Sequence, residues 1–356
     1  MKSHAAESLS IAYGPPLSDE LGLGTLTLPG FLREVTSAYG DREALAFRTA
    51  TDEIRWNYSE LWEKALEVAC ALRACGVGKD TRVGVLMTNR PEWISAVFGV
   101  SLAGGVAVTL STFSTAPELE YLLRSSSAAI LLFERSVLKT DFVTVLSELE
   151  PAMRTMAHGA LESEMFPFLR HLATIGEAPT GIDSWATSLA RGHGVPRELV
   201  EATGEAVRPS DAAVVFFSSG STSSPKGILS AHRGVAIQMW RFRRMCGFSP
   251  DDNVRCWSAN GFFWSGNFVM SLGATLASGG SLILQPVFDA RDALELMVAE
   301  RVNYPFAWPH QWAQIESLPN WLEVDLSRMR FADSKTPVAR HPTVSAELSF
   351  PEHAYG

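Results

Sequence analysis

The hydrophobic positions of this chain fall into two repeating patterns. Continuous apolar runs at 83–87, 106–110 and 129–133 predict buried β-strands. The segments between them, 91–104 and 117–124, carry apolar residues at helical spacing, which predicts amphipathic helices. Because strand and helix alternate and the strands are apolar throughout, the pattern predicts a parallel sheet covered by helices on both faces.

Polar residues at the ends of these segments predict where the helices begin and end. Asn57, followed three positions later by Glu60, predicts a capping box at the start of an early helix. Gly76 is expected to end that helix, because glycine readily adopts the left-handed backbone of a helix end. Asn89 is predicted to cap the next helix, whose first turn contains Pro91.

The same alternation returns after a stretch of mixed composition between 151 and 209. Strands are predicted at 212–217 and 281–284, with helices at 233–245 and 291–301. A chain of 356 residues exceeds what one core usually holds, so we expect two stacked α/β subdomains. The predicted divisions are an N-terminal arm at 1–28, a first subdomain at 29–205 and a second at 206–356.

Composition narrows the class of protein. A hydrophobic share of 46% and a charged share of 19% are typical of a globular protein. The net charge of −9 argues against nucleic acid as the main partner. The chain shows no apolar stretch of membrane-spanning length and no signal-peptide core, and its four cysteines lack metal-type spacing. We therefore expect a cytoplasmic protein with reduced cysteines, no transmembrane segment and no assigned metal ligand.

A hydroxyl-rich loop carries the clearest chemical signal. Residues 218–227 read Ser-Ser-Gly-Ser-Thr-Ser-Ser-Pro-Lys-Gly and directly follow the predicted strand at 212–217. Backbone N–H groups and hydroxyls can converge there on an anion, and Lys226 adds a positive charge. The residues assigned to bind the phosphates of ATP are Ser218, Ser219, Gly220, Ser221, Thr222 and Lys226.

Two other interpretations of this loop fit its sequence less well. A mobile serine-rich surface turn would need neither the buried strand before it nor Pro-Lys-Gly inside it. The spacing also fails the Walker pattern, which disfavours an unrelated ATPase or kinase.

The loop resembles the phosphate loop of the adenylate-forming superfamily, which includes acyl-CoA synthetases, luciferases and the adenylation domains of peptide synthetases. That loop reads roughly aromatic-Thr-Ser-Gly-Ser/Thr-Thr-Gly-x-Pro-Lys-Gly, and Ser223 stands here where the family usually has glycine. If the position needs a positive φ, serine costs about 1 kcal/mol. Two weaker segments, 57–61 and 102–110, also resemble family signatures, so the resemblance covers the chain from about residue 28 to its end.

The resemblance implies a pocket for a carboxylic acid. Residues 259–266 resemble the family segment that walls this pocket, and Trp264 is assigned as its gate. The alternative is simple core packing by three aromatic side chains. His310 has two interpretations, contact with the substrate and a structural role, and the structural role is favoured. His232 is interpreted as a structural residue or a helix cap, and not as a general base. The residues assigned to the acyl pocket are Phe262, Phe263, Trp264, Gly266 and Trp308.

The adenine side departs from the family pattern. Segment 331–337 stands where the family has a Gly-Gly-Ala-Pro-like turn, but the glycines are absent. The residues assigned there are Ser334, Lys335, Thr336 and Tyr355. The sequence stops at Gly356, within the family motif aromatic-Gly-x-Thr-Glu, so the Mg²⁺-binding Glu and the C-terminal catalytic Lys of the family would lie beyond it. We expect a truncated chain without the C-terminal domain, with no assigned catalytic residue and little activity by itself; the alternative is a naturally short protein.

Together these features predict the N-terminal part of an AMP-forming carboxylic acid ligase of the acyl-CoA synthetase type. The complete enzyme would use ATP, Mg²⁺ and CoA, and its small-molecule acid would be apolar: fatty, aromatic or polycyclic. One alternative is an acyl-AMP ligase that passes the acyl group to a carrier protein. Another is a non-catalytic ligand-binding or dimerisation module on the same fold. The sequence leaves the oligomeric state open, a homodimer included.

Overall fold

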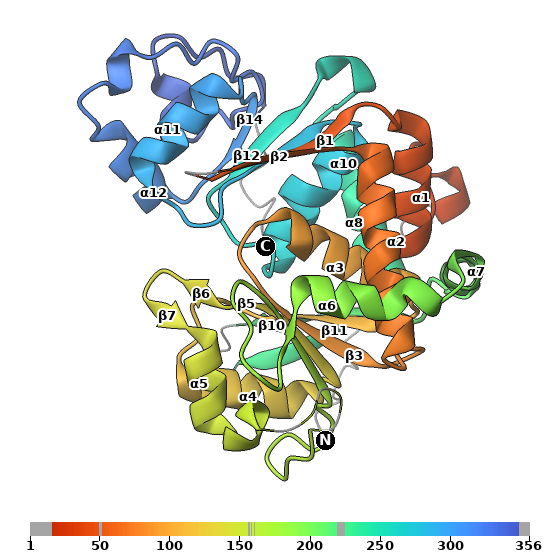
Figure 1. The fold of residues 1–356 in the computed structure, drawn as a ribbon. Coiled ribbons are helices and arrows are strands. Elements are labelled where there is room, and N and C mark those ends of the chain that lie inside the picture. Colours follow the sequence, from red (N-terminus) through yellow and green to blue (C-terminus); the bar gives the residue numbers. More distant parts are fainter. Residues whose placement is uncertain are drawn as a thin grey trace, which may run out of the picture.

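The computed structural model describes residues 16–49, 52–155, 157, 159, 161–218 and 225–348. In these residues the chain forms two large β-sheets with helices between and around them, one sheet lying above the other in Figure 1. This arrangement confirms the predicted α/β fold of parallel sheets flanked by helices.

The larger sheet has seven strands among the described residues. Their spatial order is β11 (Lys226–Ala231), β10 (Ala212–Ser218), β4 (Val106–Thr109), β3 (Arg82–Leu86), β5 (Ile130–Glu134), β8 (His171–Ile175) and β9 (Asp183–Ser184). All neighbours are parallel except β10 and β11, which form an antiparallel pair. A short antiparallel pair, β6 (Ser136–Val137) and β7 (Thr140–Asp141), follows β5.

The smaller sheet has five strands in the described part of the chain. Their order is β14 (Tyr304–Phe306), β12 (Arg255–Ser258), β13 (Ser281–Leu284), β1 (Glu43–Arg48) and β2 (Glu53–Asn57). Only β2 runs antiparallel to its neighbour. The predicted parallel sheets thus each carry one antiparallel strand at an edge, β2 in the smaller sheet and β11 in the larger. Both are edge strands with partly exposed side chains, so neither forms the continuous apolar run that identified the inner strands.

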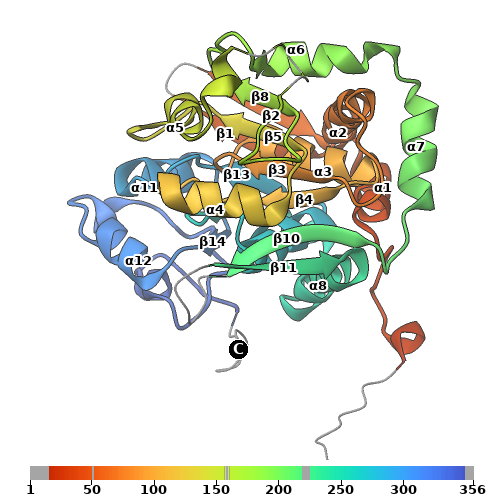
Figure 2. The ribbon, with the colours of Figure 1, turned by 90° about the horizontal axis from the view of Figure 1, so that it is seen from below.

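Helices lie in three layers around these sheets. Between the sheets lie α1 (Leu28–Tyr39), α2 (Tyr58–Ala74), α3 (Pro91–Leu102), α8 (His232–Met245) and α10 (Ala274–Ala277) (Figure 1). The outer face of the larger sheet is covered by α4 (Ala116–Ser126) and α5 (Phe142–Leu149). The outer face of the smaller sheet is covered by α11 (Ala290–Ala299) and α12 (Pro309–Glu316). Between β9 and β10 in the sequence come α6 (Trp185–Ala190) and α7 (Arg197–Ala206), which pack along the outside of α2 (Figure 2).

The alternation of side chains between the two faces of each strand explains these layers. In β5, Ile130 and Leu132 pack on the helices between the sheets, whereas Leu131 and Phe133 pack on the outer layer. The side chains of a strand point alternately to opposite faces, so a strand that is apolar throughout contributes to two cores at once. The continuous apolar runs in the sequence therefore correspond to strands buried on both faces.

Most of the predicted helix ends are confirmed. Glu60 donates its N–H to Asn57 Oδ1 at 2.7 Å, and Asn57 donates its N–H to Glu60 Oε2 at 2.8 Å, which completes the capping box of α2. Gly76 follows α2 with a φ of +82°, the left-handed conformation expected of a glycine there. The predicted cap by Asn89 was wrong: Arg90 precedes α3, and no side chain caps that helix end.

The N-terminal arm lies against α8 over its described part. The carboxylate of Glu20 pairs with Arg241 at 2.7 Å, and the indole N–H of Trp240 donates to the carbonyl oxygen of Thr25 at 3.1 Å. The predicted division at residue 205 does not coincide with a division between sheets. The larger sheet takes β10 and β11 from beyond that residue, and the smaller sheet takes β1 and β2 from before it.

Candidate functional site

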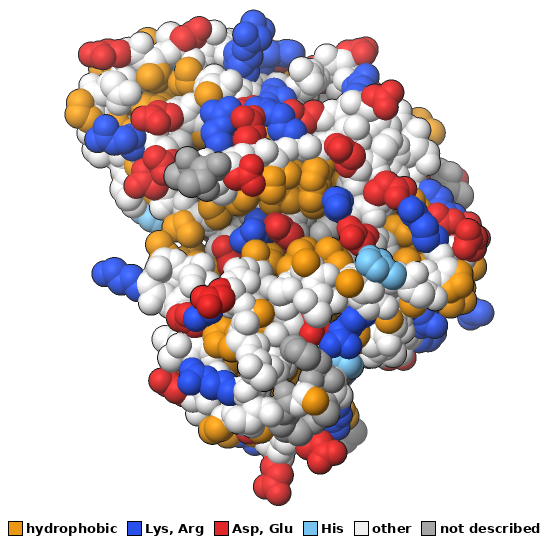
Figure 3. Space-filling model, in the orientation of Figure 1, with side chains coloured by type: hydrophobic (Ala, Val, Ile, Leu, Met, Phe, Trp, Pro, Cys, Tyr) orange, Lys and Arg blue, Asp and Glu red, His pale blue; other side chains and the backbone are white. Residues whose placement is uncertain are grey.

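The carboxyl ends of strands from both sheets open onto one crevice. The turn after β3, the turn after β4 and the loops after β12, β13 and β14 all contribute residues to it. Parallel strands end at the same edge of a sheet, and ligands of open α/β folds bind outside the carboxyl ends of the strands. Figure 3 shows the molecule hollowed between α12 above and the β6–β7 hairpin below.

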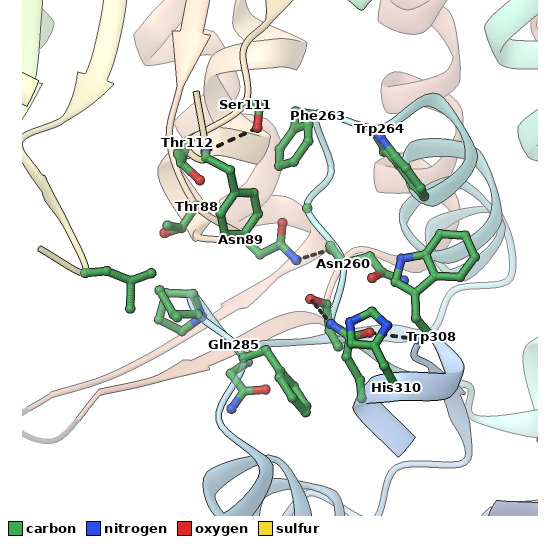
Figure 4. A pocket seen from close by; sticks show the side chains of 18 residues that line it. Thr88, Asn89, Ser111, Thr112, Asn260, Phe263, Trp264, Gln285, Trp308 and His310 are labelled. Atoms are coloured by element: carbon green, nitrogen blue, oxygen red, sulfur yellow. Dashed lines mark hydrogen bonds between the residues drawn. The ribbon is translucent and has the colours of Figure 1, made fainter. Parts of the chain in front are cut away.

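The crevice contains a cavity of about 560 Å³. Its aromatic lining consists of Phe113, Phe263, Trp264, Phe288 and Trp308. Its polar lining consists of Thr88, Asn89, Ser111, Thr112, Asn260, Gln285, His310 and Gln311, most of which are labelled in Figure 4. Among the described residues that line it there is no Lys, Arg, Asp or Glu. The cavity is therefore apolar with uncharged polar groups, as is typical of a small-molecule site.

Two tryptophans form a wall of this cavity. The rings of Trp264 and Trp308 meet edge to face, with centroids 5.1 Å apart and planes at 88°. Their exposed fractions are 44% and 43%, so both rings stand at the mouth of the cavity. Phe263 packs against Phe113 from the turn after β4, with a centroid distance of 6.1 Å. The aromatic wall thus joins loops that belong to both sheets.

An ion-pair cluster lies directly behind the polar lining. Arg90 Nη1 lies 2.9 Å from Glu134 Oε1, and Arg90 Nε lies 2.8 Å from Glu92 Oε2. The second oxygen of Glu134 accepts from the N–H and the hydroxyl of Thr88, at 3.1 and 2.7 Å. Burial acts to lower the pKa of Arg90, but the two carboxylates outweigh burial and raise it. The guanidinium therefore stays charged and paired, and the cluster fixes Thr88 at the cavity wall.

A second, smaller hollow of about 260 Å³ adjoins the cavity. The two share Ser111, Phe113, Phe263 and Trp264. The smaller hollow is also lined by Ser218 and Pro225, which are the described residues on either side of the hydroxyl-rich loop. The predicted phosphate loop therefore leaves and re-enters the fold beside the aromatic cavity.

Comparison with known families identifies the fold. Residues 32–348 match the family model described as AMP-binding enzyme. The chain belongs to this family. The match confirms the resemblance inferred from the phosphate loop and from the segments around 57–61 and 102–110.

Several relatives of this chain are named as coenzyme A ligases. A ligase from Mycobacterium tuberculosis, named for a propanoyl group on a methyl-dioxo-octahydro-indenyl bicycle, is 28% identical over 322 residues, which are 90% of this chain and 58% of that protein. The human mitochondrial medium-chain acyl-CoA ligase is 24% identical over 314 residues, 86% of this chain and 50% of that protein. The chain thus spans about half the length of these curated relatives.

A solved structure shares the fold. The anthranilate CoA ligase AuaEII, crystallised with anthranoyl-AMP, superposes with a TM-score of 0.69 at 22% identity, covering 87% of this chain and 55% of that one. The likeness supports the same two-sheet architecture.

Only the two ends of the predicted phosphate site lie among the described residues. Ser218 is the last residue of β10 and Lys226 is the first residue of β11, and the two are paired in register across the hairpin. Lys226 is exposed. The other assigned residues, Ser219, Gly220, Ser221 and Thr222, lie outside the described residues, as does Ser223.

The structure brings together part of the predicted acyl pocket. Phe263, Trp264 and Trp308 line the cavity, but Phe262 and Gly266 are absent from its lining. Phe262 is buried and packs on Trp93 of α3, with ring centroids 5.5 Å apart. The ring of Phe262 therefore anchors the loop in the core, while the next two rings, of Phe263 and Trp264, face the cavity.

The predicted adenine-side segment is a tight turn held by Asp333. Lys335 donates its N–H to Asp333 Oδ1 at 3.0 Å, and the hydroxyl of Thr336 donates to the carbonyl oxygen of Asp333 at 2.6 Å. Ser334 donates its N–H to the carbonyl oxygen of Leu348 at 2.8 Å. None of Ser334, Lys335 and Thr336 lines the 560 Å³ cavity, and Tyr355 lies outside the described residues.

Sequence reasoning missed the polar side of the site. Thr88, Asn89, Ser111 and Gln285 each follow a predicted strand within a few positions. Their place directly after predicted strands could have identified them, because polar residues just after parallel strands face the ligand crevice. His310 is exposed and lines the cavity, a position that suits its alternative interpretation, contact with the substrate, better than the favoured structural role.

Proposed function

We propose that this chain is the ATP- and acid-binding part of an AMP-forming carboxylic acid ligase of the acyl-CoA synthetase type. The observation that carries the proposal is the aromatic cavity at the carboxyl ends of both sheets, which adjoins the ends of the phosphate loop. A carboxylic acid in the cavity and ATP on the loop would place the two reactants side by side.

The reaction needs an acid oxygen in line with the α-phosphorus of ATP. A bond forms between them as the bond to the β-phosphate oxygen breaks, which gives an acyl-adenylate and pyrophosphate. In the complete enzyme the thiol of CoA would then displace AMP. The role of Lys226 and the loop hydroxyls would be to hold the phosphates and to neutralise the charge that collects on the leaving group.

The cavity supports an acid with an uncharged, largely apolar body. A second carboxylate or an ammonium group would be desolvated there without a charged partner among the described lining residues. The rings of Phe263, Trp264 and Trp308 offer flat apolar surfaces, which suit aromatic, polycyclic or fatty acids.

The Mg²⁺ implied by the family resemblance has no multi-residue site of its own in the described part of the chain. No three His, Cys, Asp or Glu side chains among the described residues form a group that could hold a metal ion. We therefore derive no step through Mg²⁺ from these residues.

We also propose a cytoplasmic location. All four cysteines are free thiols, and burial raises the pKa of Cys246 and of Cys256 to about 12, which keeps both unreactive. No helix in the described ranges is long and apolar enough to cross a bilayer.

Calorimetric titration of the chain with ATP and with a panel of N-acylsulfamoyl adenosines tests the proposed function. These compounds are stable mimics of acyl-adenylates. We expect binding of both kinds of ligand and an affinity that varies with the acyl group. Binding of neither kind would contradict the proposal.

A further inference from the structure

The side chain of Asn89 crosses from one half of the molecule to the other. Asn89 lies in the turn between β3 and α3, and 5% of its surface is exposed. Its Nδ2 donates to the carbonyl oxygen of Asn260 at 2.7 Å, and its Oδ1 accepts the N–H of Phe262 at 2.9 Å. Both polar atoms of this amide therefore hold the loop after β12, which belongs to the other sheet (Figure 4).

Buried side chains hold the same loop from its other side. Asn267 Nδ2 also donates to the carbonyl oxygen of Asn260, at 2.6 Å. Ser258 Oγ accepts the N–H of Asn260 at 3.2 Å and donates to Asn267 Oδ1 at 2.8 Å. Ser271 Oγ donates to Asn267 as well. The peptide groups of residues 260–262 are thus fixed by a network of buried and partly buried hydrogen bonds, and Asn89 is its link to the larger sheet.

The fixed peptide groups directly precede the residues that wall the cavity. Phe263 and Trp264 come next in the chain, and the carbonyl oxygen of Phe263 accepts from Thr109 Oγ1 of β4 at 3.1 Å. The loop is therefore tied to the larger sheet before and at its first cavity-facing ring. Since a ring at the end of such a loop moves with its backbone, the network sets where the aromatic wall stands.

We propose that Asn89 is a positioning residue for the acid pocket: through residues 260–262 it fixes the rings of Phe263 and Trp264 against the bound acyl group. This inference rests on the proposed function and adds to it the residue that determines the shape of the acid side. A large, rigid acyl group would depend on Asn89, whereas ATP and a small acyl group would depend on it far less.

The experiment compares Asn89→Ala with Asn89→Asp and with a matched control. Asn89→Asp keeps the acceptor for Phe262 N–H and places a carboxylate against the carbonyl oxygen of Asn260. The control, Ser95→Ala, removes a side-chain hydrogen bond of a buried residue on the adjoining helix α3, where Ser95 Oγ donates to the carbonyl oxygen of Glu92 at 3.2 Å. Each variant is titrated with ATP, acetylsulfamoyl adenosine and a bulky cyclic acylsulfamoyl adenosine.

We expect both Asn89 variants to lose affinity for the bulky analogue by about tenfold or more, the equivalent of one or two lost hydrogen bonds. Affinities for ATP and for the acetyl analogue should change by less than about threefold. In hydrogen exchange, the peptide covering residues 259–264 should exchange faster in both Asn89 variants than in Ser95→Ala.

Equal weakening of all three ligands, or unchanged exchange in that peptide, would overturn the positioning role while leaving the proposed function intact. Failure of the unaltered chain to bind any of the three ligands would overturn the proposed function, and this inference with it.

Discussion

His232 shows how burial sets the protonation of one side chain. It begins α8, is almost fully buried, and its Nδ1 accepts the N–H of Leu28, the first residue of α1, at 3.2 Å. Burial lowers the pKa of His232 to about 4, and the nearby carboxylate of Asp211 only partly opposes this. The imidazole is therefore neutral in the folded chain and satisfies a donor at a helix start.

This buried histidine predicts a pH dependence of stability. Between pH 6.5 and about 4 the unfolded chain binds a proton at His232 that the folded chain does not bind. The free energy of unfolding should therefore fall as pH drops through this window, by up to about 3 kcal/mol, and the contribution should level off below it. Urea unfolding at several pH values, compared between the unaltered chain and His232→Asn, measures the effect.

The neutral asparagine should flatten this part of the pH profile. Substitution of the exposed His193 by Gln should leave the profile unchanged. An unaltered slope in His232→Asn would contradict the interpretation.

Lys226 supplies the charge of the predicted phosphate site. Lys226→Ala should weaken ATP binding by about tenfold, because a charge-assisted contact to phosphate is lost. Calorimetry measures this, with Lys64→Ala on the exposed face of α2 as the control. If Lys226→Ala binds ATP as well as the unaltered chain does, the lysine does not face the phosphates.

Trp264 is expected to determine which acids fit. Its ring is half exposed at the cavity mouth, so Trp264→Ala should fold normally and bind ATP with unchanged affinity. Removing the ring should shift the preference among acylsulfamoyl adenosines towards bulkier acyl groups. Trp62→Ala, on α2 and away from the cavity, controls for the loss of a half-buried tryptophan. If Trp264→Ala ranks the acylsulfamoyl adenosines in the same order of affinity as the unaltered chain, Trp264 only packs against its neighbours and does not select the acid.

Asn89 also marks where local sequence patterns stop being informative. An asparagine two positions before proline matches a helix cap, and that was the prediction. In the fold its amide meets Asn260 and Phe262, more than 170 positions away. Such a partner is set by the packing of the two sheets, so no local rule could reveal it.

At the scale of elements, one ion-pair network ties the strands of the smaller sheet together. Glu300 ends α11, and its side chain is 5% exposed. Its carboxylate accepts from Arg48 of β1 at 3.1 Å, Arg55 of β2 at 2.7 Å and Arg255 of β12 at 2.6 Å. The hydrogen bond to Glu300 is the largest cause that raises the pKa of Arg55. Glu300 thus compensates three guanidinium groups at once.

Glu300→Gln should lower the free energy of unfolding by about 3 kcal/mol, because the arginines lose their buried counter-charge. Urea unfolding measures the loss. Glu205→Gln serves as the control: its partner is Arg33 and its side chain is 63% exposed, so it should cost less than about 0.5 kcal/mol. Equal losses of unfolding free energy in the two variants would show that the burial of Glu300 does not increase its contribution to stability.

The sequence predicted the inner strands and the helix ends that depend on neighbouring residues. It did not predict how the strands pair or where the edge strands lie. The run at 83–87 appears as β3 at Arg82–Leu86, and the capping box of Asn57 is present, because both depend on neighbouring residues. The pairing of β1 with β13 joins Leu45 to Leu282, a contact without a local signature. Lys226 was predicted within a loop, but it begins β11, whose Ile228 and Leu229 are exposed and resemble no buried strand.

At the scale of the whole molecule, function depends on how the two sheets face each other. Their carboxyl ends point to one crevice, so loops distant in the sequence form a single cavity. Phe263 and Trp264 of the aromatic wall were predictable, because aromatic residues close to a glycine resembled a family segment, whereas Phe262 from the same segment packs in the core. The polar wall was not, because it forms only when both sheets are in place.

The proposed function requires this crevice to hold an acid and ATP next to each other. A crystal structure of the chain with a bound N-acylsulfamoyl adenosine would reveal where both parts of the ligand lie. We expect the acyl group in the cavity against Phe263, Trp264 and Trp308, with the sulfamate next to the loop between Ser218 and Lys226. A ligand bound elsewhere, with the cavity filled only by solvent, would refute the proposed function.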